Sequence, residues 1–101
     1  MITNSRIKAY NVLKTFTQHV YYQDPGNISM IYPCIVYSRE GADTKYANGD
    51  VYGGTYEYKV TFMSKNPDDP ILDKMSRDVR LRYDTEYKTD GIYHCVFNIN
   101  I

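Results

Sequence analysis

Hydrophobic and polar residues alternate along several stretches of the chain, and this alternation predicts a β-sheet with one buried face. The clearest stretch is 55–65, in which Tyr56, Tyr58, Val60 and Phe62 share one side and polar residues mostly occupy the other. A period of two residues is typical of a strand that packs on one face and meets water on the other. The sequence therefore predicts a strand over 55–65 with its aromatic side toward the core.

Four further segments read as strands, because they are short, rich in β-branched and aromatic residues and bounded by turn residues. They are 20–22, 32–39, 81–88 and 92–101. In the last segment the alternation is again regular, with one side formed by Tyr93, Cys95, Phe97, Ile99 and Ile101. Thr89, Asp90 and Gly91 predict the turn that joins the last two strands.

Residues 40–54 separate two of these strands and contain the dipeptide Asn48–Gly49, which favours a type I′ hairpin turn. This segment predicts a long protruding hairpin or loop. A plain disordered tip is the alternative, because the runs on either side of the turn are short.

A spacing of three to four residues predicts a first helix over 5–18. The residues expected on its buried stripe are Ile7, Tyr10, Leu13, Phe16 and Val20. Thr3, Asn4 and Ser5 offer side-chain oxygens that can cap its first turn. His19 would close this helix, where a cation favours the last carbonyls.

A second helix is expected over 70–80. Asp68 or Asp69 can cap it, and Pro70 suits its first turn because the missing amide hydrogen would have no partner there. The residues expected on its buried stripe are Ile71, Leu72, Met75 and Val79. Both helices would lie against the sheet.

The order of elements predicts one α+β domain over residues 1–101. We expect a mainly antiparallel sheet of four to five strands, with two helices packed on one face and a long protruding hairpin at about 40–54. All but one of the links between strands are short enough for antiparallel neighbours. The length of 101 residues suits a single domain with one core.

Composition and charge narrow the possible functions. The 12 basic and 12 acidic residues cancel and form no long run, so the sequence carries no basic footprint for nucleic acid. No apolar stretch approaches the roughly 18 residues that a membrane-spanning helix needs, and we expect an intracellular, soluble protein. The 12 tyrosines suit half-buried sheet faces and subunit contacts, although tyrosine is also simply a good strand former.

The residues that could carry chemistry do not form a recognisable motif. Cys34 and Cys95 lie in apolar runs and are expected as buried thiols, and no cysteine pair or histidine spacing suggests a metal site. His94 lies in an alternating strand without an identifiable nucleophile beside it. We therefore expect no catalytic residues, no cofactor and no metal, and hence not an enzyme. Tyr56, Tyr58 and Tyr93 could stack on single-stranded RNA, but the balanced charge speaks against this alternative.

Three segments resemble the tail terminator and head-to-tail joining proteins of long-tailed bacteriophages. They are IYPCIVYSR (31–39), TYEYKVTFMSKNPDDPILDKM (55–75) and DTEYKTDGIYHCVFNINI (84–101). The positions that match the pattern of this family are Pro33, Ile35, Tyr37, Tyr58, Val60, Lys65, Asp68, Asp69 and Pro70.

The resemblance implies a structural virion protein without membrane contact, assembled in the host cytoplasm. Copies of the chain would form a ring, usually a hexamer, that caps the head-proximal end of the tail tube and joins it to the neck. Its partners would be the tail tube protein and neck or connector proteins, with DNA only as passing cargo. The candidate contacts to a neighbouring subunit or the ring lumen are Lys45, Tyr46, Asn48 and Tyr52. Another neck component and a non-viral module that binds peptides at its sheet edge are the alternatives.

Overall fold

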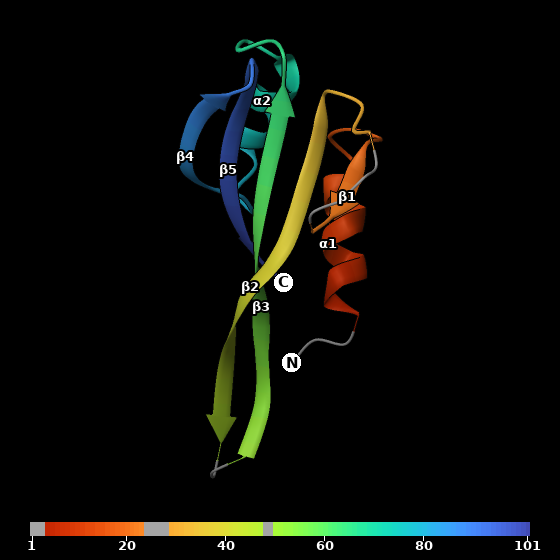
Figure 1. Ribbon diagram of the computed structural model, residues 1–101. Coiled ribbons are helices and arrows are strands. Elements are labelled where there is room, and N and C mark those ends of the chain that lie inside the picture. Colours follow the sequence, from red (N-terminus) through yellow and green to blue (C-terminus); the bar gives the residue numbers. More distant parts are fainter. Residues whose placement is uncertain (1–3, 24–28, 48–49) are drawn as a thin grey trace.

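Two helices and five strands follow one another along the chain (Figure 1). The computed structural model describes residues 4–23, 29–47 and 50–101, and between 43 and 53 it describes the main chain only. The elements are α1 (Ser5–Leu13), β1 (Val20–Tyr22), β2 (Cys34–Ala47), β3 (Asp50–Ser64), α2 (Pro70–Arg77), β4 (Arg82–Thr89) and β5 (Ile92–Asn100). The strands form one sheet in the order β1-β2-β3-β5-β4, and all neighbours except β1 and β2 are antiparallel. The predicted α+β fold class is confirmed.

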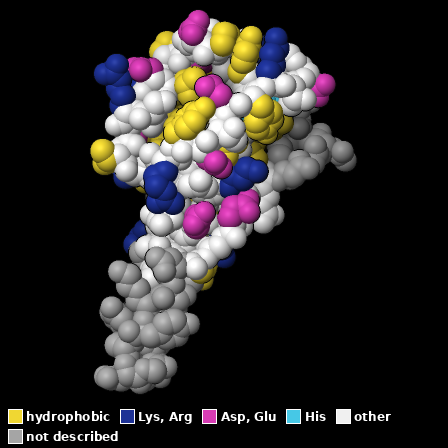
Figure 2. Space-filling view, turned by 90° about the vertical axis from the view of Figure 1, so that its left-hand side faces the viewer, with side chains coloured by type: hydrophobic (Ala, Val, Ile, Leu, Met, Phe, Trp, Pro, Cys, Tyr) yellow, Lys and Arg dark blue, Asp and Glu magenta, His cyan; other side chains and the backbone are white. Residues whose placement is uncertain are grey.

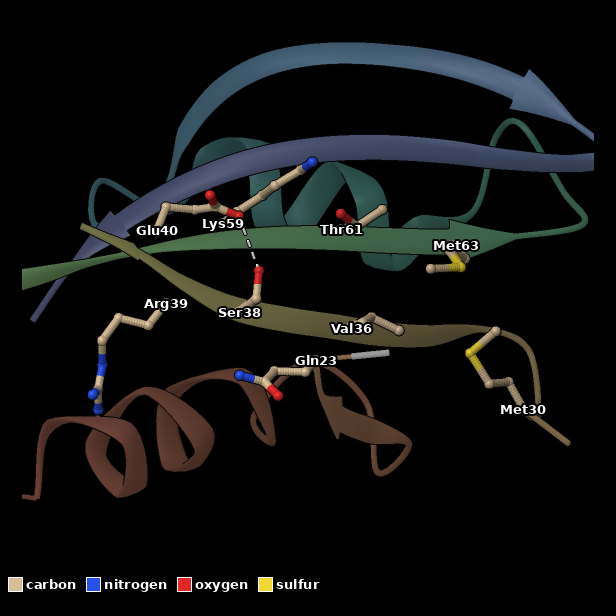
Figure 3. Close-up of a pocket in the computed structure, with 9 residues that line it drawn as sticks. All are labelled: Gln23, Met30, Val36, Ser38, Arg39, Glu40, Lys59, Thr61 and Met63. Atoms are coloured by element: carbon tan, nitrogen blue, oxygen red, sulfur yellow. Dashed lines mark hydrogen bonds between the residues drawn. The ribbon is translucent and has the colours of Figure 1, made fainter. Parts of the chain in front are cut away.

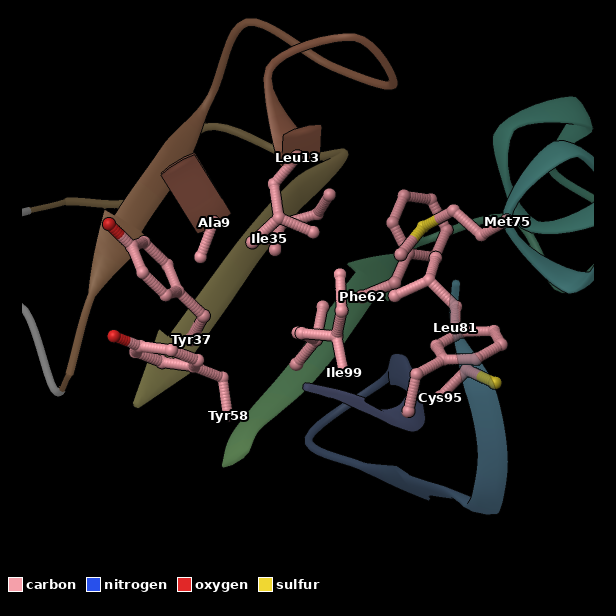
Figure 4. Close-up of a cluster of buried hydrophobic side chains, with 12 residues drawn as sticks. Ala9, Leu13, Ile35, Tyr37, Tyr58, Phe62, Met75, Leu81, Cys95 and Ile99 are labelled. Carbon is pink, nitrogen blue, oxygen red and sulfur yellow. The ribbon is translucent and has the colours of Figure 1, made fainter. Parts of the chain in front are cut away.

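The register of the three central strands explains the alternating pattern. Tyr37 lies opposite Val60, and Val60 lies opposite Phe97, so the three side chains share one face of the sheet. This face forms the core together with buried residues of both helices (Figure 4). The core residues are Ala9, Leu13, Ile35, Tyr37, Tyr58, Val60, Phe62, Met75, Leu81, Cys95, Phe97 and Ile99.

Helix α1 buries the predicted Leu13 together with two small residues that were not predicted inside. Ser5, Ala9 and Leu13, spaced by four residues, face the sheet, whereas Ile7 is 53% exposed, so its place on the buried stripe was wrong. The helix also ends at Leu13 instead of residue 18. Asn4 occupies the N-cap position without a capping hydrogen bond from its side chain. A close approach to the tyrosines of the sheet leaves room only for small side chains at Ser5 and Ala9.

Helix α2 begins as predicted and ends earlier. The side chain of Asp69 accepts a hydrogen bond of 2.9 Å from the amide of Ile71, and Pro70 occupies the first turn. The helix stops at Arg77, where Asp78 has an extended backbone. Val79 was expected on the buried stripe but is 97% exposed, because it follows the end of the helix.

Strand β1 runs parallel to β2, with Val20 opposite Ile35. The short link between them predicted antiparallel neighbours, and this expectation was wrong. At the other edge of the sheet, β4 and β5 are joined by a turn in which Asp90 and Gly91 have φ angles of 52° and 77°. Positive φ at both positions suits a two-residue hairpin turn and confirms the predicted turn. The predicted turn at Asn48–Gly49 lies outside the described residues.

The molecule is elongated, with a radius of gyration of 14.8 Å and extents of 51 × 30 × 22 Å. A compact domain of this length has a radius of gyration of about 13 Å. Figure 1 shows the cause, since β2 and β3 continue together past the rest of the sheet. No helix in the described part of the chain is long and apolar enough to cross a membrane.

Candidate functional site

The most distinctive feature is the extension of two strands beyond the common sheet, which we call the arm. It comprises residues 43–47 of β2 and 50–55 of β3, which pair with each other and with no other described strand. At about 3.3 Å per residue, the arm reaches roughly 16 Å past the sheet. An isolated two-stranded ribbon is marginally stable in water, and its two open edges favour pairing or packing with another chain.

Three of the four predicted contact residues, Lys45, Tyr46 and Tyr52, belong to the strands of this arm. Lys45 lies opposite Gly53 in the register of β2 and β3, and Tyr46 lies opposite Val51. Tyr52 belongs to β3. The side chains of these three residues lie outside the described part, as does the whole of Asn48.

The arm joins the sheet at a group of polar contacts around the buried Tyr58, which we call the root. The hydroxyl of Tyr58, 0% exposed, lies 2.6 Å from the hydroxyl of Ser5 in α1 and shares a hydrogen bond with it. Arg39 donates two longer hydrogen bonds, of 3.3 and 3.4 Å, to the same phenol oxygen. The guanidinium of Arg39 also stacks over Tyr56, 4.2 Å from the ring centre. The root thus fixes the base of the arm to the helix.

Sequence reasoning missed the role of Arg39. The signal was present, because Arg39 follows Ile35 and Tyr37 at the same spacing of two residues. A cation at the exposed end of an aromatic side of a strand can cover the neighbouring rings. Here the partners are tyrosines, whose ring faces attract a cation and whose hydroxyls accept hydrogen bonds.

Aromatic rings extend the root toward α1 and β1. Tyr22 and Tyr37 meet edge to face at 5.0 Å, and Tyr37 lies 6.1 Å from Tyr58. Arg6 lies over the ring of Tyr22 at 5.0 Å. Burial raises the pKa of Tyr37 above its ordinary value, although the charge of Arg6 opposes the shift. Because Tyr58 is wholly buried, it cannot stack on RNA bases as the alternative would require.

A hollow of about 490 Å³ lies on the opposite face of the sheet (Figure 3). Met30, Val36 and Met63 form one end, and the exposed Lys59 and Glu40 lie toward the other. The other lining residues are Gln23, Ser38, Arg39 and Thr61. The hydroxyl of Ser38 donates a hydrogen bond of 3.1 Å to Glu40. This mixture of apolar and polar groups suits a docked side chain.

The cysteines and the histidines are accounted for by local packing. Cys34 and Cys95 are free and buried, as predicted, and burial raises the pKa of both thiols to about 11. A buried thiol with a high pKa is a poor nucleophile. His94 lies 3.0 Å from the carbonyl of Ile92 through Nδ1 and stacks on Tyr87. His19 lies beyond the end of α1, so its predicted role in closing that helix was wrong.

Within residues 4–23, 29–47 and 50–101, no group of three or more His, Cys, Asp or Glu side chains is placed to hold a metal ion. Comparison with protein-family models finds none that matches the chain. Comparison with curated proteins and with solved structures finds no match either. What the structure shows is a two-stranded ribbon that extends from the sheet and is held at its base by the contacts of Tyr58.

Proposed function

We propose that this chain is a structural subunit of a bacteriophage virion, a tail terminator. Copies of it form a ring that caps the head-proximal end of the tail tube and joins it to the neck. The observation that carries the proposal is the arm, a ribbon of two strands that leaves the sheet and ends away from the core. The resemblance of three sequence segments to this family adds to it.

A subunit that works by packing needs an element that reaches a neighbour and a base that holds the element in place. The arm supplies reach, with two strand edges that have no partner among the described residues. The root supplies stiffness, because Tyr58 ties β3 to Ser5 and Arg39 covers the junction. A fixed base reduces the entropy that an arm loses when it docks.

Shortening the arm tests this proposal. A variant that lacks residues 45–52 and carries Asn-Gly in their place removes no residue of the core. The inserted Asn-Gly and Gly53 then form a three-residue turn, which keeps Thr44 opposite Gly54 as in the full chain. We expect its thermal unfolding to match that of the full chain, and we expect it to remain monomeric where the full chain forms rings. The measurements are calorimetry and mass photometry on the same samples.

A matched control changes the other hairpin. Asp90→Asn keeps a residue that tolerates the positive φ of the β4–β5 turn, and this variant should form rings like the full chain. Single substitutions Lys45→Ala, Tyr46→Ala, Asn48→Ala and Tyr52→Ala then rank the contacts of the arm. Ring formation by the shortened variant would refute the role of the arm, and loss of folding would show that the arm belongs to the core.

A further inference from the structure

Strand β2 contains one extra residue at the point where the arm leaves the sheet. Arg39 of β2 lies opposite Tyr58 of β3. Gly41, two residues later in β2, lies opposite Glu57, which is the direct neighbour of Tyr58. Glu40 therefore has no counterpart in β3, and this is the geometry of a β-bulge. An extra residue of this kind bends the strand that carries it and increases the twist of the pair.

The bulge lies at the level at which β2 and β3 lose their other neighbours. Strand β1 pairs with β2 as far as Tyr37, and the end of the chain bonds to β3 as far as Tyr56. A bend at this level moves the arm as a whole and leaves the central strands in place. Figure 1 shows the strong twist of the pair, since β2 lies on the β1 side of β3 within the sheet and has crossed over β3 in the arm.

A second register shift lies too near the end of the arm to aim it. It falls between Lys45 and Tyr46. Two described pairs follow it, Tyr46 with Val51 and Ala47 with Asp50. A bend at this place turns the tip and leaves the direction of the ribbon unchanged.

The surface next to the base of the arm is solvated. Glu40, Gly41 and Ala42 are all exposed. On the β4 side, Figure 2 shows charged side chains of both signs on the lower part of the domain, from which the arm extends in Figure 1. Charged side chains favour contact with water over burial under another element. The main chain at the base of the arm is therefore the feature that sets its direction.

The bulge depends on the extra residue and not on the side chain that this residue carries. The Ser38 hydroxyl donates a hydrogen bond of 3.1 Å to Glu40, but this bond is exposed, so water can replace it. Gly41 does not have a left-handed φ, and a Cβ at this position would meet no atom beyond its chain neighbours within 4 Å. Glu40→Ala and Gly41→Ala should therefore keep the bulge and serve as matched controls.

We propose that Glu40 is a positioning residue, because the bulge that it forms turns the arm and sets the direction in which the arm meets a neighbouring subunit. The root fixes where the arm begins, and the bulge fixes where it points. This inference rests on the proposed function, in which the arm contacts the next copy. A closed ring requires the same angle at every contact, and an arm held in that direction loses less entropy when it docks.

Deletion of Glu40 removes the bulge without disturbing the register. Arg39 remains opposite Tyr58 and Gly41 remains opposite Glu57, so the two strands pair residue by residue through the base of the arm. Because Glu40 is exposed and lies outside the core, the thermal unfolding of this variant should match that of the full chain. A second variant, with an alanine inserted between Glu40 and Gly41, enlarges the bulge and provides the test if the deletion prevents folding.

Two distances from the arm to the domain report its direction. Asn48→Cys, between β2 and β3, is combined with Lys74→Cys in α2 or with Lys8→Cys in α1, and both lysines are exposed. Spin labels on these cysteines are measured by pulsed electron paramagnetic resonance, at a concentration at which the chain is monomeric. The native Cys34 and Cys95 are buried and react poorly with the label.

The expected shift follows from the length of the arm. Strand β2 continues over residues 41–47 beyond the bulge, which is roughly 23 Å at about 3.3 Å per residue. A change in direction of about 20°, comparable to the twist between neighbouring strands, moves the end of this segment by about 8 Å. The deletion and the insertion should each shift at least one of the two distances by this amount. Glu40→Ala and Gly41→Ala should leave both distances unchanged.

Ring formation, followed by mass photometry, tests whether assembly uses this direction. Variants with a redirected arm should lose the rings, and the two alanine variants should keep them. Distances that agree with those of the full chain within half of the expected shift would overturn the inference. Rings that persist with a redirected arm, or loss of folding in both the deletion and the insertion variant, would overturn it as well. A full chain that forms no rings would refute the proposed function, and the distances would still decide whether the bulge aims the arm.

Discussion

The hydroxyl of Tyr58 is expected to stabilise the root, and Tyr58→Phe tests this directly. The substitution keeps the ring that packs in the core and removes only the oxygen that lies 2.6 Å from Ser5 and accepts from Arg39. If the root fixes the arm to α1, the loss of this one oxygen should weaken the whole domain.

The magnitude follows from the burial of the two partners. Tyr58 and Ser5 are 0% and 2% exposed, so water cannot replace the lost hydrogen bond without a rearrangement. A buried hydroxyl left without a partner costs about 1–3 kcal/mol. Arg39 is exposed, and its hydrogen bonds of 3.3 and 3.4 Å are long, so water replaces them at little cost. We expect a loss of about 2 kcal/mol, which lowers the melting temperature of a domain of this size by about 8–16 °C.

Urea unfolding of the purified chain measures the free energy of unfolding. Tyr37→Phe is the matched control, because Tyr37 packs in the same cluster and its hydroxyl makes no hydrogen bond to the described residues. Loss of the Tyr37 hydroxyl should lower the free energy of unfolding by about 0.5 kcal/mol or less. Combining Tyr58→Phe with Ser5→Ala removes both partners and should cost less than the sum of the single changes. A Tyr58→Phe variant as stable as the Tyr37→Phe variant would refute the role of the root.

Three further predictions concern local interactions. Asp69→Ala removes the cap of α2 and should lower the free energy of unfolding by about 1 kcal/mol in urea. Burial raises the pKa of Cys34 and Cys95 from 9.0 to about 11, so the thiols ionise first in the unfolded chain and stability should fall as the pH rises from 9 to 11. A double Cys→Ala variant should show a smaller fall, which begins nearer pH 10 because burial also raises the pKa of Tyr37. The hydrogen bond from Arg80 lowers the pKa of Asp78 from 3.8 to about 2. The stability that ionised Asp78 contributes should therefore disappear as the pH falls from about 4 to about 2, and an Asp78→Asn variant should show no such loss.

Strands were easier to predict than helices in this chain because their pattern repeats over many residues. Phe62 and Phe97 occupy the core as the alternation indicated, and the β4–β5 turn lies where Asp90 and Gly91 predicted it. Such positions depend on the spacing of hydrophobic residues and on the types of neighbouring turn residues, and both can be read from the sequence.

The buried side of α1 depended on a contact that no local pattern contains. Ser5 is polar and was not expected in the interior, but it is buried because Tyr58, 53 residues away along the chain, supplies its hydrogen bond. Ile7 is apolar and was expected inside, but the helix turns it outward. Hydrophobic spacing does not reveal which small residues a crowded sheet will accept.

The surface of the domain was only partly visible in the sequence. The turn residues of 40–54 indicated a protruding segment, whereas its pairing up to Ala47 and Asp50, with two register shifts, depends on the contact between two strands. The exposure of Val79, Tyr83 and Tyr87 depends on where α2 ends and on the place of β4 at the edge of the sheet. Both are tertiary properties.

The proposed role in tail termination is tested most directly in phage particles. Lysates of a phage that lacks the gene for this chain can be imaged by electron microscopy, with the full chain or the variant lacking residues 45–52 supplied in trans. We expect tail tubes of irregular length that are not joined to heads, restored to normal particles by the full chain and not by the shortened one. Tails of normal, uniform length joined to heads in the absence of the chain would contradict the proposal.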